Sequence, residues 1–222
     1  MSKKLVQNEV REVIDELSGV IFKSHEEYSE SSKIFFKERY STIISFLPQI
    51  SRADIGLEIG LCGGILAFSI RRLFKLNKLY TLEHPITSKH YTGQFIKKLA
   101  NENIINVPVD LRAGLLPWKN NYFDFVIFSE VIEHLVPSDI PLVINEIKRV
   151  LKRRGWALIT TPNIASFSKR INLLRGKNPI EFDLTLHDQA TYGHIREYTM
   201  EELTSVMGGG KNFKERLFYD RH

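Results

Sequence analysis

The sequence contains a single cysteine in 222 residues, Cys62, which excludes an internal disulfide framework and a zinc site built on several thiolates. It has no apolar run near the roughly 20 residues that a membrane helix needs, so we expect no membrane partner. The N-terminus leads into a mixed polar stretch without the apolar core of a signal peptide, so we do not expect export. These absences favour a protein of the reducing cytoplasm.

The charge balance does not single out a partner. The formal net charge of +5 is compatible with an acidic or nucleic-acid partner. The densest basic groups, Lys148-Arg149 and Lys152-Arg153-Arg154, come late in a predicted helix, where cations suit the negative end of the helix dipole. We therefore interpret them as a solvated helix end rather than as a nucleic-acid surface.

The first fifty residues are predicted to be helical. Apolar residues recur there at intervals of three and four, and a second such stretch, 34–47, ends at Pro48. The apolar face of the first helix consists of Leu5, Val6, Val10, Val13, Ile14 and Leu17. We expect residues 1–50 to form an N-terminal helical cap or lid.

From residue 55 onward, strands alternate with helices. Strands are predicted at 55–59, 78–82, 104–109, 123–128 and 156–160. Helices are predicted at 65–73, at 92–101, from a cap at Ser138 to Leu151 with Gly155 as the stop, and at 200–207. Such alternation with short loops predicts an α/β domain over residues 51–222 with a doubly wound, mostly parallel sheet. The segment 165–195 interrupts it and is expected to be a cap or substrate-facing insertion, and a last strand is predicted at 213–219.

A glycine-rich loop follows the first predicted strand. Its sequence is Leu57-Glu58-Ile59-Gly60-Leu61-Cys62-Gly63-Gly64. Glycines accept a positive φ and let a ligand approach the backbone, but hydride-transfer enzymes share this device. Two further acids separate the alternatives, because Glu83 ends the second predicted strand and Asp110 ends the third. Three acids at the ends of successive strands converge on one edge of the sheet, where they can bind the polar groups of a nucleoside.

The chain resembles the class I S-adenosylmethionine-dependent methyltransferases over about residues 55–207. The resemblance rests on the glycine loop, Val109-Asp110-Leu111 running to Leu116-Pro117-Trp118, Asn121-Tyr122-Phe123-Asp124-Phe125-Val126, Glu130-Val131-Ile132-Glu133-His134-Leu135, Thr161-Pro162-Asn163, and His194-Ile195-Arg196-Glu197-Tyr198-Thr199. It implies a Rossmann-like methyltransferase fold that binds S-adenosylmethionine and releases S-adenosylhomocysteine. The implied cofactor-binding residues are Glu58, Gly60, Cys62, Gly63, Gly64, Glu83, Asp110, Leu111 and Ser129, with Glu83 at the ribose and Asp110 with the Leu111 backbone at the adenine.

The sequence departs from the family pattern at two places. Cys62 stands where the family's loop usually has a glycine, and its side chain could shift the cofactor or weaken its binding. We expect Cys62 to be a small buried hydrophobe rather than a reactive thiol. The family fold usually closes with a hairpin of two strands, whereas one strand is predicted before His222.

The groups after the fourth strand are the candidates for chemistry. An oxygen acceptor has to lose a proton, which calls for a base or a metal. Glu130, Glu133 and His134 would share one face of a helical turn, and His134 is the leading general-base candidate.

A metal-assisted alternative comes from a narrower resemblance. The Glu-x-x-Glu-His arrangement with a later histidine resembles two groups of metal-dependent O-methyltransferases, which act on small-RNA 3′ ends and in ubiquinone biosynthesis. That resemblance implies a divalent ion held by Glu130, Glu133, His134 and His194, a set that suits manganese, iron or zinc better than magnesium. In the metal-free alternative, Glu133 and His134 belong to a motif widespread in metal-free methyltransferases, where they shape the pocket and cap a helix.

The sequence therefore predicts an S-adenosylmethionine-dependent methyltransferase, which O-methylates a small-molecule acceptor and acts as a monomer or homodimer. A metal-assisted RNA 2′-O-methyltransferase, a nicotinamide-dependent dehydrogenase and a non-catalytic cofactor-binding protein are the alternatives. A dehydrogenase would leave Asp110 and the Glu130 to Leu135 segment without a role.

Overall fold

A parallel five-stranded sheet organises the chain in the computed structural model, which describes residues 1–21, 28–180 and 193–208. The strand order is β3-β2-β1-β4-β5, and each neighbouring pair is parallel. The strands are β1 (Gly56–Ile59), β2 (Leu79–Glu83), β3 (Ile104–Pro108), β4 (Phe123–Ser129) and β5 (Leu151–Thr160). This order confirms the doubly wound, Rossmann-like fold, with the direction of winding reversed between β1 and β4.

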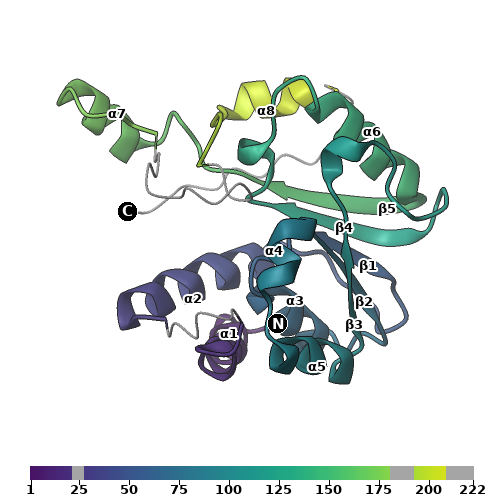
Figure 1. Cartoon of the computed structure of the whole chain (residues 1–222). Coiled ribbons are helices and arrows are strands. Elements are labelled where there is room, and N and C mark those ends of the chain that lie inside the picture. Colours follow the sequence, from purple (N-terminus) through teal and green to yellow (C-terminus); the bar gives the residue numbers. More distant parts are fainter. Residues whose placement is uncertain (22–27, 181–192, 209–222) are drawn as a thin grey trace.

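Helices cover both faces of the sheet (Figure 1). They are α1 (Lys3–Leu17), α2 (Glu30–Ser45), α3 (Ile65–Leu73), α4 (Pro85–His90), α5 (Gly93–Asn101), α6 (Ile140–Val150), α7 (Phe167–Leu174) and α8 (Met200–Val206), with the 3₁₀ turns η1 (Leu111–Ala113) and η2 (Ile132–His134). Alternate residues of β4 point to opposite faces, so that Phe125 and Ile127 join the core under α1, α3 and α5. Val126 and Phe128 join the core under α6.

The N-terminal helices are part of the first core. The predicted apolar face of α1 is buried at Val6, Val10, Val13, Ile14 and Leu17, whereas Leu5 is exposed. Helix α1 packs against α2 and α3, and α2 begins earlier than predicted because the Ser29 side chain caps it.

Three local predictions are wrong. Helix α4 follows β2 directly, where no helix was predicted. The α6 N-cap is Asp139 rather than Ser138. Strand β5 begins at Leu151, immediately after α6, and Gly155 lies inside it at a register shift opposite β4. A Cβ on Gly155 would lie 2.9 Å from the Asp124 carbonyl oxygen, so this glycine permits a close backbone approach rather than ending a helix.

The insertion predicted at 165–195 contains α7, and the strand predicted at 213–219 lies outside the described residues. None of the helices in the described ranges has the length and apolarity needed to cross a membrane.

Candidate cofactor and acceptor site

The glycine loop lies where the winding of the sheet reverses, next to the carboxyl end of β1. Gly60, Cys62, Gly63 and Gly64 all have a positive φ, from 38° to 87°. The Gly60 and Leu61 amides donate hydrogen bonds to the Leu82 carbonyl, which ties the loop to β2. The carboxyl edge at such a reversal is where open α/β sheets bind ligands.

Cys62 differs from its prediction, because its side chain is exposed rather than buried. Its φ of 38° is uncommon for a residue with a Cβ, and its amide donates a hydrogen bond of 3.0 Å to Glu83 Oε2. Burial of the sulfur's surroundings, together with the Glu83 carboxylate, raises the pKa of the thiol to about 11.

Glu58 and Glu83 lie on adjacent strands beside this loop. Glu58 is buried, and its Oε2 has no hydrogen-bond partner among the described residues. Burial and the neighbouring Glu83 raise the pKa of Glu58 well above its ordinary value. Glu83 accepts hydrogen bonds from the amides of Cys62 and His84 and from the Tyr91 hydroxyl at 2.9 Å. Glu83 thus stabilises the glycine loop through hydrogen bonds. It also lies at the position where the sequence predicts a ribose-binding acid.

Asp110 stands two residues beyond β3, not at its end. It caps η1, which begins at Leu111, and both its oxygens accept hydrogen bonds from the Arg112 side chain. The Arg112 guanidinium lowers the pKa of Asp110 to about 2. The Asp110 carboxylate is thus ionised and held on the β3 side of the same edge.

Residues that follow α1 and precede α2 contact the loop. A Cβ at Gly63 would lie 3.1 Å from Ile21 Cδ1 and 3.2 Å from the Tyr28 hydroxyl. Burial raises the pKa of Tyr28 to about 12. Arg39 of α2 forms an ion pair with Glu130, so the cap and the segment after β4 are joined by a charged contact.

Ser129 and Glu130 belong to a polar chain at the ends of β4 and β5. Thr160 Oγ1 donates to Glu130 Oε1 at 2.8 Å, and the Ser129 hydroxyl lies 2.7 Å from the same Thr160 oxygen. Because the Thr160 hydroxyl donates its hydrogen to Glu130, the Ser129 hydroxyl is the donor in its hydrogen bond with Thr160. Glu130 has a positive φ of 55° and precedes η2, so it does not share a helical face with Glu133 and His134 as predicted.

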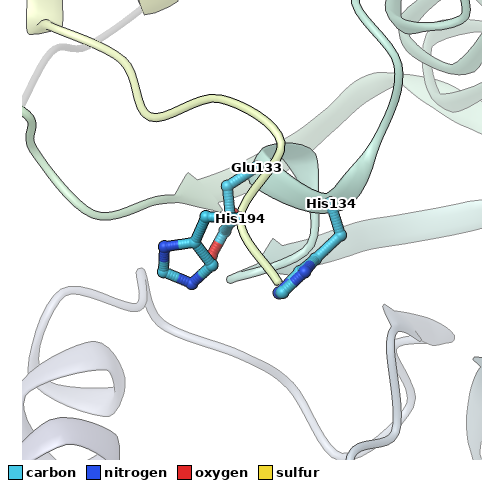
Figure 2. Close-up of side chains that lie close together, drawn as sticks. All are labelled: Glu133, His134 and His194. Carbon is cyan, nitrogen blue, oxygen red and sulfur yellow. The ribbon is translucent and has the colours of Figure 1, made fainter. Parts of the chain in front are cut away.

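Glu133, His134 and His194 form one cluster (Figure 2). One ligand atom from each lies within 4.8 Å of the others, and the two imidazole rings meet edge to face with centroids 5.1 Å apart. The backbone amides of the next two residues after His194, Ile195 and Arg196, donate to the Glu133 carbonyl, which brings the two distant segments together. The structure therefore gathers three of the four residues of the predicted metal set and leaves Glu130 paired with Arg39.

The Glu133 carboxyl is buried. The Thr161 hydroxyl donates to its Oε2 at 3.1 Å, and its Oε1 has no hydrogen-bond partner in the described part of the chain. Burial and the nearby Glu130 raise the pKa of Glu133 to about 8. An unpaired buried oxygen of this kind is costly unless a ligand, a proton or a cation satisfies it.

His194 is oriented by a buried carboxylate. Its Nδ1 lies 2.8 Å from Glu197 Oε1, and the other Glu197 oxygen forms an ion pair with Lys169 of α7. The Glu197 side chain is fully buried. Because a carboxylate accepts, Nδ1 carries the hydrogen and the lone pair of the ring is on Nε2.

The ligand atoms of Glu133, His134 and His194 are of the kinds that bind a divalent cation. One carboxylate oxygen and two imidazole nitrogens form a donor set that suits manganese, iron or zinc, and the Glu197 contact to His194 is the kind of outer hydrogen bond that orients a metal-binding imidazole. The same groups also suit proton transfer without a metal.

Sequence reasoning assigned no role to Arg39, Thr160, Lys169 or Glu197. The ion pair of Arg39 joins residues 91 positions apart, and no local pattern reports such a contact. Glu197 had one available signal, since it follows His194 at a spacing of three in the same motif.

Residues 57–159 match the family described as a methyltransferase domain. No curated protein matches the chain in sequence.

Solved structures share the fold. A S-adenosylmethionine-dependent methyltransferase from Archaeoglobus fulgidus is 17% identical with a TM-score of 0.54, and the match covers 77% of this chain and 66% of that one. The YcgJ protein of Bacillus subtilis is 18% identical with a TM-score of 0.54, over 76% of this chain and 65% of that one. A S-adenosylmethionine-dependent methyltransferase from Aquifex aeolicus is 15% identical with a TM-score of 0.53, over 77% of each chain. The chain spans about two thirds of the length of the first two.

Proposed function

We propose that the chain is a class I S-adenosylmethionine-dependent methyltransferase, as the match of residues 57–159 to a methyltransferase domain suggests, and that it methylates a hydroxyl group of a small-molecule acceptor. The observation that carries the proposal is the meeting of two features at one sheet edge. The glycine loop with Glu58 and Glu83 lies on one side of the winding reversal, and the Glu133, His134 and His194 cluster follows β4 on the other.

The residues of the loop fit the cofactor. Within the described ranges, Glu58 Oε2 is a buried oxygen without a hydrogen-bond partner, which a bound ammonium or water would satisfy. Gly60, Cys62, Gly63 and Gly64 would present backbone to the cofactor. Glu83 would bind the ribose and Asp110 the adenine, with the Leu111 backbone and Ser129 at the same edge of the sheet. S-adenosylmethionine supplies a methyl group on a positively charged sulfur, which leaves as a thioether.

His194 is the base that the contacts support best. The acceptor hydroxyl loses its proton to Nε2, and the resulting imidazolium keeps its Nδ1 hydrogen bond to the Glu197 carboxylate. His134 lies beside it and is the second candidate. Holding the hydroxyl in line with the methyl group contributes further, because positioning lowers the entropy cost of the displacement.

Cofactor binding is tested by calorimetry. We expect S-adenosylhomocysteine to bind the full chain, and Glu83→Ala to weaken binding by at least about tenfold, since a carboxylate that binds two hydroxyls contributes charge-assisted hydrogen bonds. Glu102→Ala, which removes a carboxylate that pairs with Arg72 at the C-terminal end of α5, is the control. Absence of binding at millimolar ligand would reject the family function for this chain.

The acceptor atom is tested with a panel of phenols, catechols, alcohols and amines. Transfer of labelled methyl to hydroxyls, lost in His194→Ala and retained in part in His134→Ala, would support the proposal. Transfer to amines alone, or cofactor binding without turnover on any acceptor, would contradict it. Salt-dependent binding and methylation of RNA would favour the nucleic-acid acceptor instead.

A metal-assisted version is the second candidate, favoured by the unpaired Glu133 Oε1 beside two imidazoles. Glu133, His134 and His194 would hold the cation, which would lower the pKa of the acceptor hydroxyl. Manganese binding to the chelator-treated protein, measured by calorimetry, should disappear in His194→Ala and remain in Glu130→Gln. If the chelator-treated protein binds no manganese, iron or zinc and keeps its activity, this version is excluded.

A further inference from the structure

Helix α7 has the reverse of the usual distribution of side chains. Among its residues, only Lys169 is buried, whereas Phe167, Leu173 and Leu174 are 80%, 65% and 83% exposed. A globular protein usually buries large apolar side chains and leaves lysine in water. Other large apolar residues are exposed on this protein, but α7 places three of them within a single helix of eight residues.

The exposed face of α7 is also basic. Phe167, Arg170 and Leu174 are spaced by three and four, so they share one side of the helix, and all three are exposed. Arg175 and Lys177 follow at its C-terminal end and are also exposed. The sequence contains no aspartate or glutamate between Glu146 and Glu181, so no acidic residue of this stretch offsets the charge.

A buried ion pair fixes the orientation of α7 about its own axis. Lys169 is 7% exposed and forms an ion pair with the buried Glu197, which in turn contacts His194. Leaving either charge buried without its partner would be costly. The contact therefore determines which side of the helix faces outward, and the apolar and basic side is that side.

The shape of this surface favours a lipid partner. Figure 1 shows α7 projecting from the body of the protein, beyond the end of the sheet. A protein partner would need a matching groove for a convex helix, whereas the boundary between lipid headgroups and acyl chains accommodates one. Phosphate backbones of nucleic acids would pair with the arginines but offer nothing to Phe167, Leu173 and Leu174.

We propose that α7 docks this protein on anionic lipid membranes, with Phe167, Leu173 and Leu174 inserted at the acyl boundary and Arg170, Arg175 and Lys177 among the headgroup phosphates. The docking is peripheral and needs no membrane-spanning helix, but it departs from the expectation of no membrane partner. It places the carboxyl edge of the sheet near the lipid surface, because only residues 161–166 separate the end of β5 from the start of α7 at that edge. It does not depend on methyl transfer.

Vesicle binding of the full chain tests the proposal. We expect sedimentation with vesicles of phosphatidylcholine and phosphatidylglycerol in a roughly two-to-one ratio, and binding at least about tenfold weaker to phosphatidylcholine alone. The variant F167S/L173S/L174S should bind about a hundredfold more weakly, since it loses three apolar side chains. The variant R170Q/R175Q/K177Q should lose a similar factor at low salt.

Matched controls separate this surface from the general positive charge. Arg153 and Arg154 are exposed at the opposite end of β5, so R153Q/R154Q removes charge without touching α7 and should bind vesicles within about twofold of the wild type. Leu142→Ser removes a half-exposed leucine on α6 and should bind like the wild type. Circular dichroism and S-adenosylhomocysteine binding verify that each variant is folded.

Two results would overturn the proposal. One is a wild-type chain that does not bind anionic vesicles at low salt, or α7 variants that bind as well as the wild type. The other is a change of oligomeric state in F167S/L173S/L174S without a change in vesicle binding, which would assign the face to contact with a second copy. Neither result bears on methyl transfer, which is measured with soluble acceptors.

Discussion

Cys62 stands in the glycine loop where the resemblance to the methyltransferases leads us to expect a glycine, and its thiol can be used as a chemical probe of the loop. It is the one cysteine of the sequence, its side chain is exposed, and its amide is bonded to Glu83. A thiol with a pKa of about 11 carries little thiolate at neutral pH. Exposure and low reactivity are therefore combined in one side chain.

Alkylation of Cys62 by iodoacetamide measures this directly. At pH 8 the thiolate is about 0.1% of the folded population and about a quarter of the unfolded one, so the folded protein should react roughly two orders of magnitude more slowly. Because the pKa is raised, the rate should climb about tenfold per pH unit until about pH 11. Intact mass spectrometry follows the reaction, with urea-unfolded protein as the control. Equal rates for the two states at pH 8 would contradict the burial of the thiol's surroundings.

The place of a candidate site residue could be predicted from the sequence where it depends on the end of a strand. It could not be predicted where it depends on contact with a distant segment. Glu58 and Glu83 are on the predicted strands because apolar runs and glycines mark those strands. The sequence could not separate Glu130 from Glu133, since the pairing of Glu130 with Arg39 and the burial of Glu133 are both consequences of packing between segments far apart in the chain.

At the scale of an element, α2 is held over the loop by Arg39. We expect Arg39→Met to raise the dissociation constant of S-adenosylhomocysteine roughly tenfold, because α2 loses its contact with the segment after β4, while the free energy of unfolding changes by about 1 kcal/mol or less. Calorimetry and urea unfolding measure the two quantities. Lys37→Met, on the same helix, should leave both unchanged, and equal effects of the two variants would show that Arg39 has no special role.

Helix α8 depends on its first turn. The Thr199 side chain accepts from the Glu202 amide, and the Glu202 side chain accepts from the Thr199 amide, which completes a capping box. Thr199→Ala should therefore cost about 1 kcal/mol in the free energy of unfolding. Thr204→Ala removes a hydroxyl from the interior of the same helix and should cost little, so urea denaturation of the pair isolates the cap.

Element types followed from periodicity, whereas several boundaries did not. After Val150 the chain passes from a helix, where apolar residues recur every three or four positions, to a strand, where they recur every two. The basic residues Lys152, Arg153 and Arg154 interrupt the apolar pattern at this point, so the sequence predicts a continuing helix although they belong to β5. The prediction that Gly155 ends a helix was wrong because a glycine is needed there for a close approach to the Asp124 carbonyl. That approach is a contact between two strands, which the local sequence does not show. The short α4 carries no buried residue and therefore no apolar period to find.

At the scale of the whole molecule, the predicted cap of residues 1–50 and the sheet share one core. Ile14 is completely buried beside residues of α3 and β4, so α1 is not an independent layer. We expect Ile14→Ala to destabilise the protein by about 3 kcal/mol and to shift the unfolding transition seen by Trp118 and Trp156 fluorescence together with that seen by circular dichroism. Leu5→Ala, at an exposed position of α1, is the control. A variant whose fluorescence transition stays in place would show that α1 unfolds by itself.

The packing of α1 against α3 has a consequence for how the chain is made. Helix α1 leaves the ribosome before α3, but its apolar side faces α3, which ends at Leu73. At typical elongation rates, the stretch between them takes roughly 3 to 11 seconds to synthesise. During that interval a strongly amphipathic segment waits without its partner, so the nascent chain passes through a stage at which holding chaperones have a defined target.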